Sequence, residues 1–274
     1  MWRGLYTAAS GMITETRRTD TIANNLANAD TNGFKKDVAI NKEFAPMYLR
    51  RINDQDPSLE VTSFKRFSLS SRPPRVGTLG LGSSIAEIAT SRIQGPLKTT
   101  GNPLDLAISG DGFFAVQTAQ GVRYTRDGAF FRSSTGELQN TMGYPVLNTQ
   151  GRPITIPGDS VHINIDIRGT ISVTDPQNDL ASQGIGQLMF VDFGPDRRAI
   201  IKQGDNLWNP RPGAVPQPAT GEIQQGFLEA SNSNVVSEMV ELINNYRIYE
   251  AGSKSVTTQD TMLEKAVSDI GRLT

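Results

Sequence analysis

The chain has 274 residues, enough for one large domain or two smaller ones, and its formal net charge of −1 excludes a strongly basic nucleic-acid-binding protein. It holds no cysteine, which excludes disulfides, thiolate metal sites and cysteine nucleophiles. Because no run of about eighteen apolar residues occurs and the first residues lack an apolar stretch, we expect neither a membrane span nor a cleavable secretory signal.

The first predicted element is an N-terminal axial helix within residues 1–33. Leu5, Met12 and Leu26 lie seven residues or a multiple of seven apart, and Ile22 belongs to a second row. Such a repeat is typical of a coiled-coil seam. Thr and Ala fill the other seam positions, so a helix of about 24 residues with this stripe is marginal alone in water. The Asn32-Gly33 pair ends the segment, because both residues tolerate the left-handed conformation.

Residues 34–85 are predicted to form an extended connector, because this segment is rich in Pro, Ser and Gly and shows no sustained period. Residues 86–225 show short alternating segments between Gly and Pro turns, typical of an all-β barrel or sandwich. The strands expected there are Leu104–Ile108, Phe113–Gln117, Val122–Arg126, Ala129–Arg132, Tyr144–Leu147, Ile154–Ile156, Val161–Asp166, Thr170–Thr174, Gln187–Asp192 and Ala199–Ile201. Asp127-Gly128 is a two-residue hairpin signal, which predicts that the strands on either side of it pair.

The last predicted element is a C-terminal axial helix within residues 226–274, which we expect to pair with residues 1–33. Its apolar positions follow alternating steps of four and three, the repeat of a coiled-coil seam. A helix from Asn234 to about Arg272 is roughly 60 Å long, more than a compact domain of this size needs. Residues 1–42 carry a charge balance of +2 and residues 229–274 a balance of −3, which favours pairing and sets its register.

These elements predict an α+β fold, in which long terminal helices form a coiled-coil-like axial domain beside a central all-β domain. The simpler alternative makes both helices ordinary flanking helices of one domain. We expect instead that the two helices pair and that other copies of the chain complete their unfilled seams. The residues expected at this assembly interface are Leu5, Met12, Ile22, Leu26, Val235, Met239, Leu242, Tyr246, Tyr249, Val256 and Leu263.

The sequence offers little for catalysis or metal binding. The single histidine, His162, alternates onto the polar face of a predicted strand. Asp105, Asp111 and Asp127 lie at predicted strand ends and turns, where Asp commonly caps backbone N–H groups. We therefore predict no catalytic residue, no cofactor and no metal site, and expect a protein that is not an enzyme. Glycoside hydrolysis by two distant carboxylates that meet in the fold stays an open alternative, although no feature of the sequence points to a particular pair.

Segments in three regions of the chain resemble bacterial flagellar rod and hook proteins. At the N-terminus they are residues 5–12, 22–28 and 31–35, which include Asn32-Gly33-Phe34-Lys35. At the C-terminus they are residues 228–236, 238–240 and 246–250. In the middle they are residues 104–108, 112–114 and 124–128. The pattern is similar to the rod proteins, distal and proximal, more than to the longer hook protein.

The resemblance implies a structural subunit of the flagellar basal-body rod, most like the distal type, that polymerises helically through its terminal helices. Its implied location is the basal body in the cell envelope, after export without a cleaved signal peptide. The implied partners are further copies of the chain, adjacent axial proteins of the rod and hook, and the flagellar type III export apparatus. Nucleic-acid binding and membrane insertion are not expected. The alternative function is an adhesin-like envelope or surface binding module that carries a terminal coiled coil.

Overall fold

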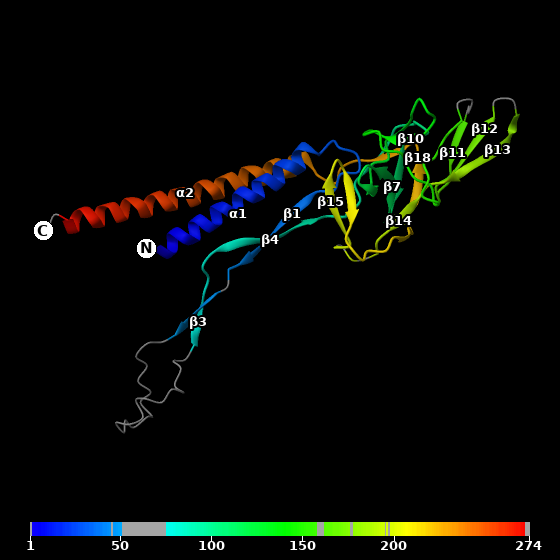
Figure 1. Ribbon diagram of the computed structural model, residues 1–274. Coiled ribbons are helices and arrows are strands. Elements are labelled where there is room, and N and C mark those ends of the chain that lie inside the picture. Colours follow the sequence, from blue (N-terminus) through cyan, green and yellow to red (C-terminus); the bar gives the residue numbers. More distant parts are fainter. Residues whose placement is uncertain are drawn as a thin grey trace, which may run out of the picture. The chain divides into compact units, whose positions relative to one another are not determined.

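The computed structural model describes residues 2–44, 46–50, 75–157, 162–175, 178–194, 196 and 198–271. A helix lies at each end of the chain, and the residues between the two helices form a mainly β region, as the sequence predicts (Figure 1). The chain divides into two compact units. The helical unit comprises Met1–Ala23, Val38–Ala89 and Val240–Thr274, and the β unit comprises Asn24–Asp37 and Thr90–Met239.

The N-terminal helix, α1, covers Trp2–Ala27. Its hydroxyl side chains are satisfied within the helix, because each donates to a carbonyl three or four residues earlier. These side chains are Thr7, Ser10, Thr14, Thr16, Thr19 and Thr21. A polar helix of this kind gains little from apolar packing of its own. The turn after α1 contains Gly33, at φ +66°.

The C-terminal helix, α2, covers the 37 residues Val235–Gly271. At about 1.5 Å per residue it is roughly 55 Å long. Asn234 caps its start, since the Asn234 Oδ1 atom accepts hydrogen bonds from the backbone N–H groups of Val236 and Ser237 at 3.0 and 3.1 Å. A cap of this type stabilises a helix by about 1 kcal/mol. Within the described part of the chain, neither helix combines the length and the apolar character needed to cross a membrane.

The predicted connector holds paired strands where the structure describes it. β1 (Asp37–Glu43) pairs with β4 (Ser83–Thr90), and β2 (Met47–Arg50) pairs with β3 (Arg75–Leu79). The β2–β3 pair is antiparallel. The Pro-rich part of the predicted connector, residues 51–74, lies outside the described residues.

The β unit is organised around a six-stranded antiparallel sheet. Its strands, in spatial order, are β15 (Ile200–Gly204), β16 (Leu207–Pro210), β8 (Gly121–Thr125), β7 (Phe113–Thr118), β14 (Phe190–Asp192) and β17 (Gln217–Pro218). A three-stranded sheet contains β11 (His162–Ile165), β12 (Thr170–Asp175) and β13 (Asn178–Gln187). Strand pairs are formed by β6 (Leu106–Ser109) with β18 (Glu222–Gln225), β5 (Leu97–Thr99) with β19 (Phe227–Glu229), and β9 (Phe130–Arg132) with β10 (Leu138–Asn140).

The core of the β unit lies on both sides of β7, because successive side chains of a strand point to opposite faces. Phe114 belongs to one cluster and contacts the ring of Phe130, with 5.2 Å between ring centroids. Phe113 belongs to the other and lies 5.5 Å from the ring of Trp208. Both faces of β7 are therefore buried, and the central region is mainly β. Its closure into a barrel or sandwich stays a prediction.

Most of the predicted strands coincide with observed ones, but the predicted hairpin at Asp127-Gly128 is wrong. β8 pairs with β7 and β16, while β9 pairs with β10. Gly128 instead allows the backbone to approach Leu106 closely, because a Cβ at residue 128 would overlap the carbonyl oxygen of Leu106. The Leu106 N–H donates to the Gly128 carbonyl at 3.0 Å. Residues 144–147 and 154–156 form only isolated bridges.

Candidate functional site

A buried cluster of charged side chains lies in the β unit where both terminal segments meet the central region. Glu229, the last residue of β19, is only 1% exposed. Its Oε1 atom lies 2.5 Å from Lys35 Nζ, and its Oε2 atom lies 3.3 Å from Arg126 Nη1. Lys35 comes from the turn after α1 and Arg126 directly follows β8. The three residues therefore join the beginning, the middle and the end of the chain.

Backbone groups supply the remaining hydrogen bonds of this charged cluster. The Gly95 N–H donates to Glu229 Oε1 at 2.9 Å, and Lys35 Nζ donates to the Ile93 carbonyl at 2.9 Å. Arg126 Nη2 donates to the Gly110 carbonyl at 2.8 Å. Nearly every group is paired, as buried charges require.

Two cations face one carboxylate in this cluster, so its formal charge is +1. Burial lowers the pKa of Lys35, and the attraction of Glu229 opposes that shift. The Arg126 guanidinium lies 5.3 Å from the centroid of the Phe113 ring, which stabilises a cation through the quadrupole of the ring. Glu229 is thus the residue on which both buried cations depend.

A second layer of polar contacts ties residues 25–37 to residues 229–238. Asn25 Nδ2 donates to the Asp37 carbonyl at 2.8 Å, and the Asp37 N–H donates to Asn25 Oδ1 at 2.9 Å. Asn232 Oδ1 accepts from the Lys36 N–H at 2.7 Å. Lys36 Nζ lies 3.4 Å from Glu238 Oε1, and Glu238 is 2% exposed. The two contacts of Lys36 join residues that are 196 and 202 positions apart in the sequence.

Lys202 of β15 adds a further tie to the N-terminal segment. Its Nζ atom lies 3.0 Å from Asp37 Oδ2 and 3.9 Å from the centroid of the Phe34 ring, and it donates to the Lys35 carbonyl. Burial lowers the pKa of Lys202, while the Asp37 carboxylate acts in the opposite direction. The N-terminal segment is therefore held by the sheet as well as by the C-terminal segment.

We expect Asp127, beside the charged cluster, to make the stability of the β unit depend on pH. Burial raises the pKa of Asp127, although its Oδ1 atom accepts a hydrogen bond from the Ala129 N–H at 3.1 Å. A carboxyl group whose pKa is raised by folding contributes stability at low pH, which is lost as pH rises through the window above its unfolded value of about 3.9. We expect Asp127→Asn to remove this loss.

Urea unfolding of both proteins at about pH 4 and about pH 7 checks this expectation. The free energy of unfolding of the variant, relative to the native chain, should rise between the two pH values. An unchanged difference would contradict the inferred burial of the Asp127 carboxyl group.

In the helical unit, α1 and α2 contact each other through polar and small side chains. Asn245 Nδ2 donates to the Glu15 carbonyl at 2.7 Å and to Thr19 Oγ1 at 2.5 Å. Gly252 lies against Met12, where a Cβ would stand 3.0 Å from Met12 Cγ. The row of α2 in contact with α1 thus includes an amide and a glycine. A coiled-coil geometry for this contact stays a prediction.

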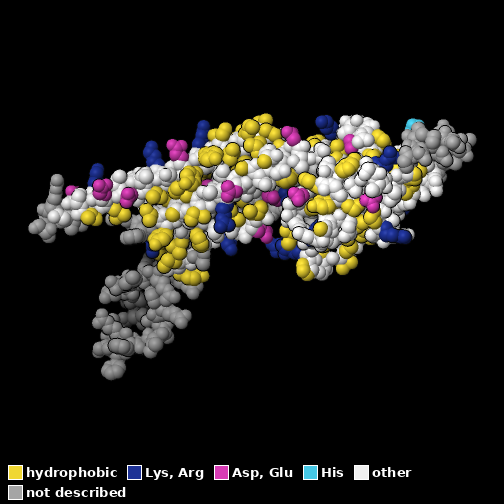
Figure 2. Space-filling model, turned by 45° about the horizontal axis from the view of Figure 1, so that its top comes forward, with side chains coloured by type: hydrophobic (Ala, Val, Ile, Leu, Met, Phe, Trp, Pro, Cys, Tyr) yellow, Lys and Arg dark blue, Asp and Glu magenta, His cyan; other side chains and the backbone are white. Residues whose placement is uncertain are grey.

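The expected assembly residues differ in how far their side chains are exposed to solvent. Ile22 is buried, and the half-buried members are Leu5, Met12, Leu26, Leu242, Val256 and Leu263. The exposed members are Val235 (37%), Met239 (48%), Tyr246 (57%) and Tyr249 (39%). Figure 2 shows hydrophobic side chains in patches on the surface of the helical unit. Their role in assembly stays a prediction.

The three members of the charged cluster share one feature in the sequence. Lys35, Arg126 and Glu229 each lie within a segment that carries the family resemblance, one at each end and one in the middle. Only the fold shows that these side chains meet.

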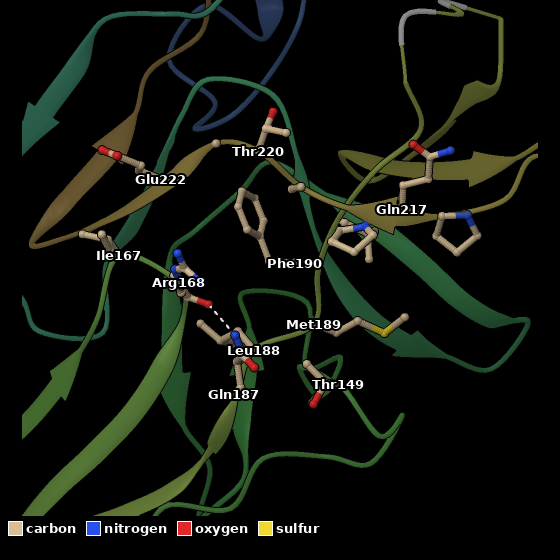
Figure 3. Close-up of a pocket in the computed structure, with 15 residues that line it drawn as sticks. Thr149, Ile167, Arg168, Gln187, Leu188, Met189, Phe190, Gln217, Thr220 and Glu222 are labelled. Carbon is tan, nitrogen blue, oxygen red and sulfur yellow. Dashed lines mark hydrogen bonds between the residues drawn. The ribbon is translucent and has the colours of Figure 1, made fainter.

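A cavity of about 830 Å³ in the β unit lies beside β14 and β17 (Figure 3). Phe190 projects into it, and Gln187 Nε2 donates to the Arg168 carbonyl at 3.0 Å along its wall. Its charged lining residues are Arg168 and Glu222. Over the described ranges, no three His, Cys, Asp or Glu side chains gather as a metal site would require, and His162 is exposed.

Comparison with known proteins places both terminal segments and the middle in flagellar families. Residues 5–35 match the family described as flagella basal body rod protein, and residues 224–269 match the flagellar basal body rod FlgEFG protein C-terminal family. Residues 107–173 match the flagellar hook protein FlgE/F/G D1 domain. All three members of the charged cluster lie within these matches.

Full-length relatives show the same likeness. The chain is 34% identical to the flagellar basal-body rod protein FlgG of Bacillus subtilis, over 98% of this chain and 99% of the relative. It is 35% identical to FlgG of Borreliella burgdorferi, over 96% and 97%. It is 34% identical to the flagellar basal-body rod protein FlgF of Caulobacter vibrioides, over the whole of both chains.

Proposed function

The chain belongs to the flagellar basal-body rod protein family and is a structural subunit of that rod, and we propose that it polymerises helically through its two terminal helices. Its location is the flagellar basal body. The distal-rod type fits the FlgG name that two of the three relatives above carry. We propose no enzymatic activity for it.

The exposed apolar side chains of α2 carry this proposal. Met239 and Tyr246 are 48% and 57% exposed, and they lie seven residues apart on one side of the helix. α1 contacts the neighbouring row, which contains Asn245 and Gly252. An apolar row left in water beside a polar contact favours packing against another protein surface. In a homopolymer that surface belongs to another copy, and each contact is repeated head to tail.

The proposed partners follow from the same family membership. They are further copies of this chain, adjacent axial proteins of the rod and hook, and the flagellar export apparatus through which the chain would pass. The polar seam of α1 supports passage in an unfolded state, because a helix with so few apolar contacts gains order mainly on assembly. The charged cluster then fixes both terminal segments to the β unit.

A single charge on the exposed row of α2 tests polymerisation. We expect Tyr246→Asp to leave the chain folded but to reduce its amount in isolated basal bodies roughly tenfold or more, because assembly would bury an unpaired carboxylate. Asn244→Asp is the matched control, since Asn244 is exposed on nearly the opposite side of the same turn and the added charge is identical.

The measurement is an immunoblot of basal bodies from cells whose own copy is replaced by each variant, together with swimming motility. Circular dichroism of the purified variants checks folding. Normal incorporation of Tyr246→Asp would remove the assembly role from this row, and equal loss with Asn244→Asp would show that charge alone is responsible.

A further inference from the structure

A second apolar row of α2 lies on the side of the helix that faces away from α1. Val240 and Ile243 are each 53% exposed. Ile243 precedes Asn245 by two residues, which places the two side chains about 160° apart around the helix. Because Asn245 contacts α1 of the same chain, Val240 and Ile243 are directed away from that helix. This row adjoins the one that contains Met239 and Tyr246, because Ile243 lies four residues after Met239 and three residues before Tyr246.

The helical unit also carries an apolar groove of matching character. The groove has a volume of about 290 Å³ and lies between α1 and the segments flanking the β1–β4 pair. Ile13, Phe44 and Ile85 form its apolar walls, and Ile13 and Phe44 are 63% and 44% exposed. The groove is preformed, since Thr14 Oγ1 lies 2.9 Å from the Ser10 carbonyl oxygen of α1 and 3.1 Å from the Ser83 carbonyl oxygen of β4, which places the strand against the helix.

Charge decides which surface of another copy suits this groove. Three arginines and two acidic residues give α1 a net charge of +1, and Arg17 lines the groove. Six acidic and three basic residues give α2 a net charge of −3. Two α2 helices would repel each other, whereas α2 against α1 is attractive. The row on α2 and the groove beside α1 are therefore complementary in both apolar character and charge.

We propose that the row formed by Val240 and Ile243 inserts into the groove formed by Ile13, Phe44 and Ile85 of another copy of this chain. The inference rests on the proposed helical polymerisation and names the two surfaces of one of its contacts. Because the surfaces differ, the contact is heterologous and repeats from copy to copy without closing. An apolar helix edge in a preformed groove is a common mode of recognition.

The absence of cysteine from the native sequence allows a direct test by cross-linking. Cells would carry Ile13→Cys, Ile243→Cys or both substitutions in one chain, and a short bis-maleimide would be added to isolated basal bodies. We expect the double variant to form a ladder of dimers, trimers and longer chains, and each single variant to stay monomeric. Dimers from Ile243→Cys alone would overturn the proposal in favour of contact between two α2 helices.

A second pair of variants keeps the test decisive if the cysteine chain fails to assemble. We expect Ile243→Lys to reduce incorporation into basal bodies roughly tenfold or more, because a lysine would enter an apolar groove. Ile248→Lys is the control, since Ile248 is 52% exposed but lies on another side of α2. Equal incorporation of the two lysine variants would overturn the proposed groove.

The two experiments also separate this inference from the proposed function. Incorporation of the double cysteine variant without a ladder would reject the groove while leaving helical polymerisation intact. Unchanged incorporation of both Tyr246→Asp and Ile243→Lys would reject polymerisation through α2 itself.

Discussion

Replacement of Glu229 by glutamine is expected to lower the free energy of unfolding of the chain by about 3–5 kcal/mol, the usual cost of removing one partner of a buried ion pair. The change leaves Lys35 and Arg126, which are 2% and 3% exposed, as two buried cations with no carboxylate between them. Urea unfolding followed by circular dichroism would measure the loss.

The same cluster predicts an asymmetry between its members. Lys35→Met removes one cation and leaves Glu229 paired with Arg126, so we expect a clearly smaller loss than for Glu229→Gln. Glu222→Gln makes the same chemical change at an exposed carboxylate and should alter stability by less than about 0.5 kcal/mol. Equal effects of the Glu229 and Lys35 variants would show that the charge balance of the cluster is unimportant.

Replacement of Gly128 by alanine is expected to destabilise the chain by more than about 3 kcal/mol, beyond the usual range for an overpacked core. The added Cβ would overlap the carbonyl oxygen of Leu106, a backbone atom of strand β6, and the Leu106 side chain is fully buried. Because a backbone atom in a strand moves only with its neighbours, β6 and its partner β18 would have to shift. Thermal unfolding would measure the effect as a lower Tm.

The matched control for Gly128→Ala is Gly184→Ala. Gly184 also lies in the β unit, within β13, and a Cβ there has no heavy atom within 4 Å. We expect its stability to stay within about 0.5 kcal/mol of the native chain. A native Tm for Gly128→Ala would mean that the approach of Leu106 to residue 128 is looser than the structure describes.

The terminal helices were predictable because their signal is local. Repeats of seven in α1 and of four and three in α2 need no knowledge of any distant residue. What the repeat does not reveal is which of two adjacent rows contacts the same chain. The structure places Asn245 and Gly252 of α2 against α1, while Tyr246 stays exposed.

The failures of the sequence analysis arise from contacts between distant residues. The Asp127-Gly128 hairpin failed because β8 finds its partners in β7 and β16, and Gly128 is needed for close approach to Leu106. Strand β19 was missed because three residues show too little alternation to be recognised. The charged cluster was missed because Lys35 and Glu229 are 194 residues apart, and no local sequence pattern extends over so many residues.

The hydrogen bonds of Asn245 have a mechanical consequence for a structural subunit of the rod. The side-chain amide of Asn245 donates to both the Glu15 carbonyl and the Thr19 hydroxyl, so the two bonds fix the axial position of α1 relative to α2. Sliding one helix past the other by one turn, about 5.4 Å, would break both bonds at once. A smooth apolar seam resists such sliding less, because one leucine replaces another. Polar contacts of this kind make the helix pair stiff in shear, which suits a structural subunit of the rod.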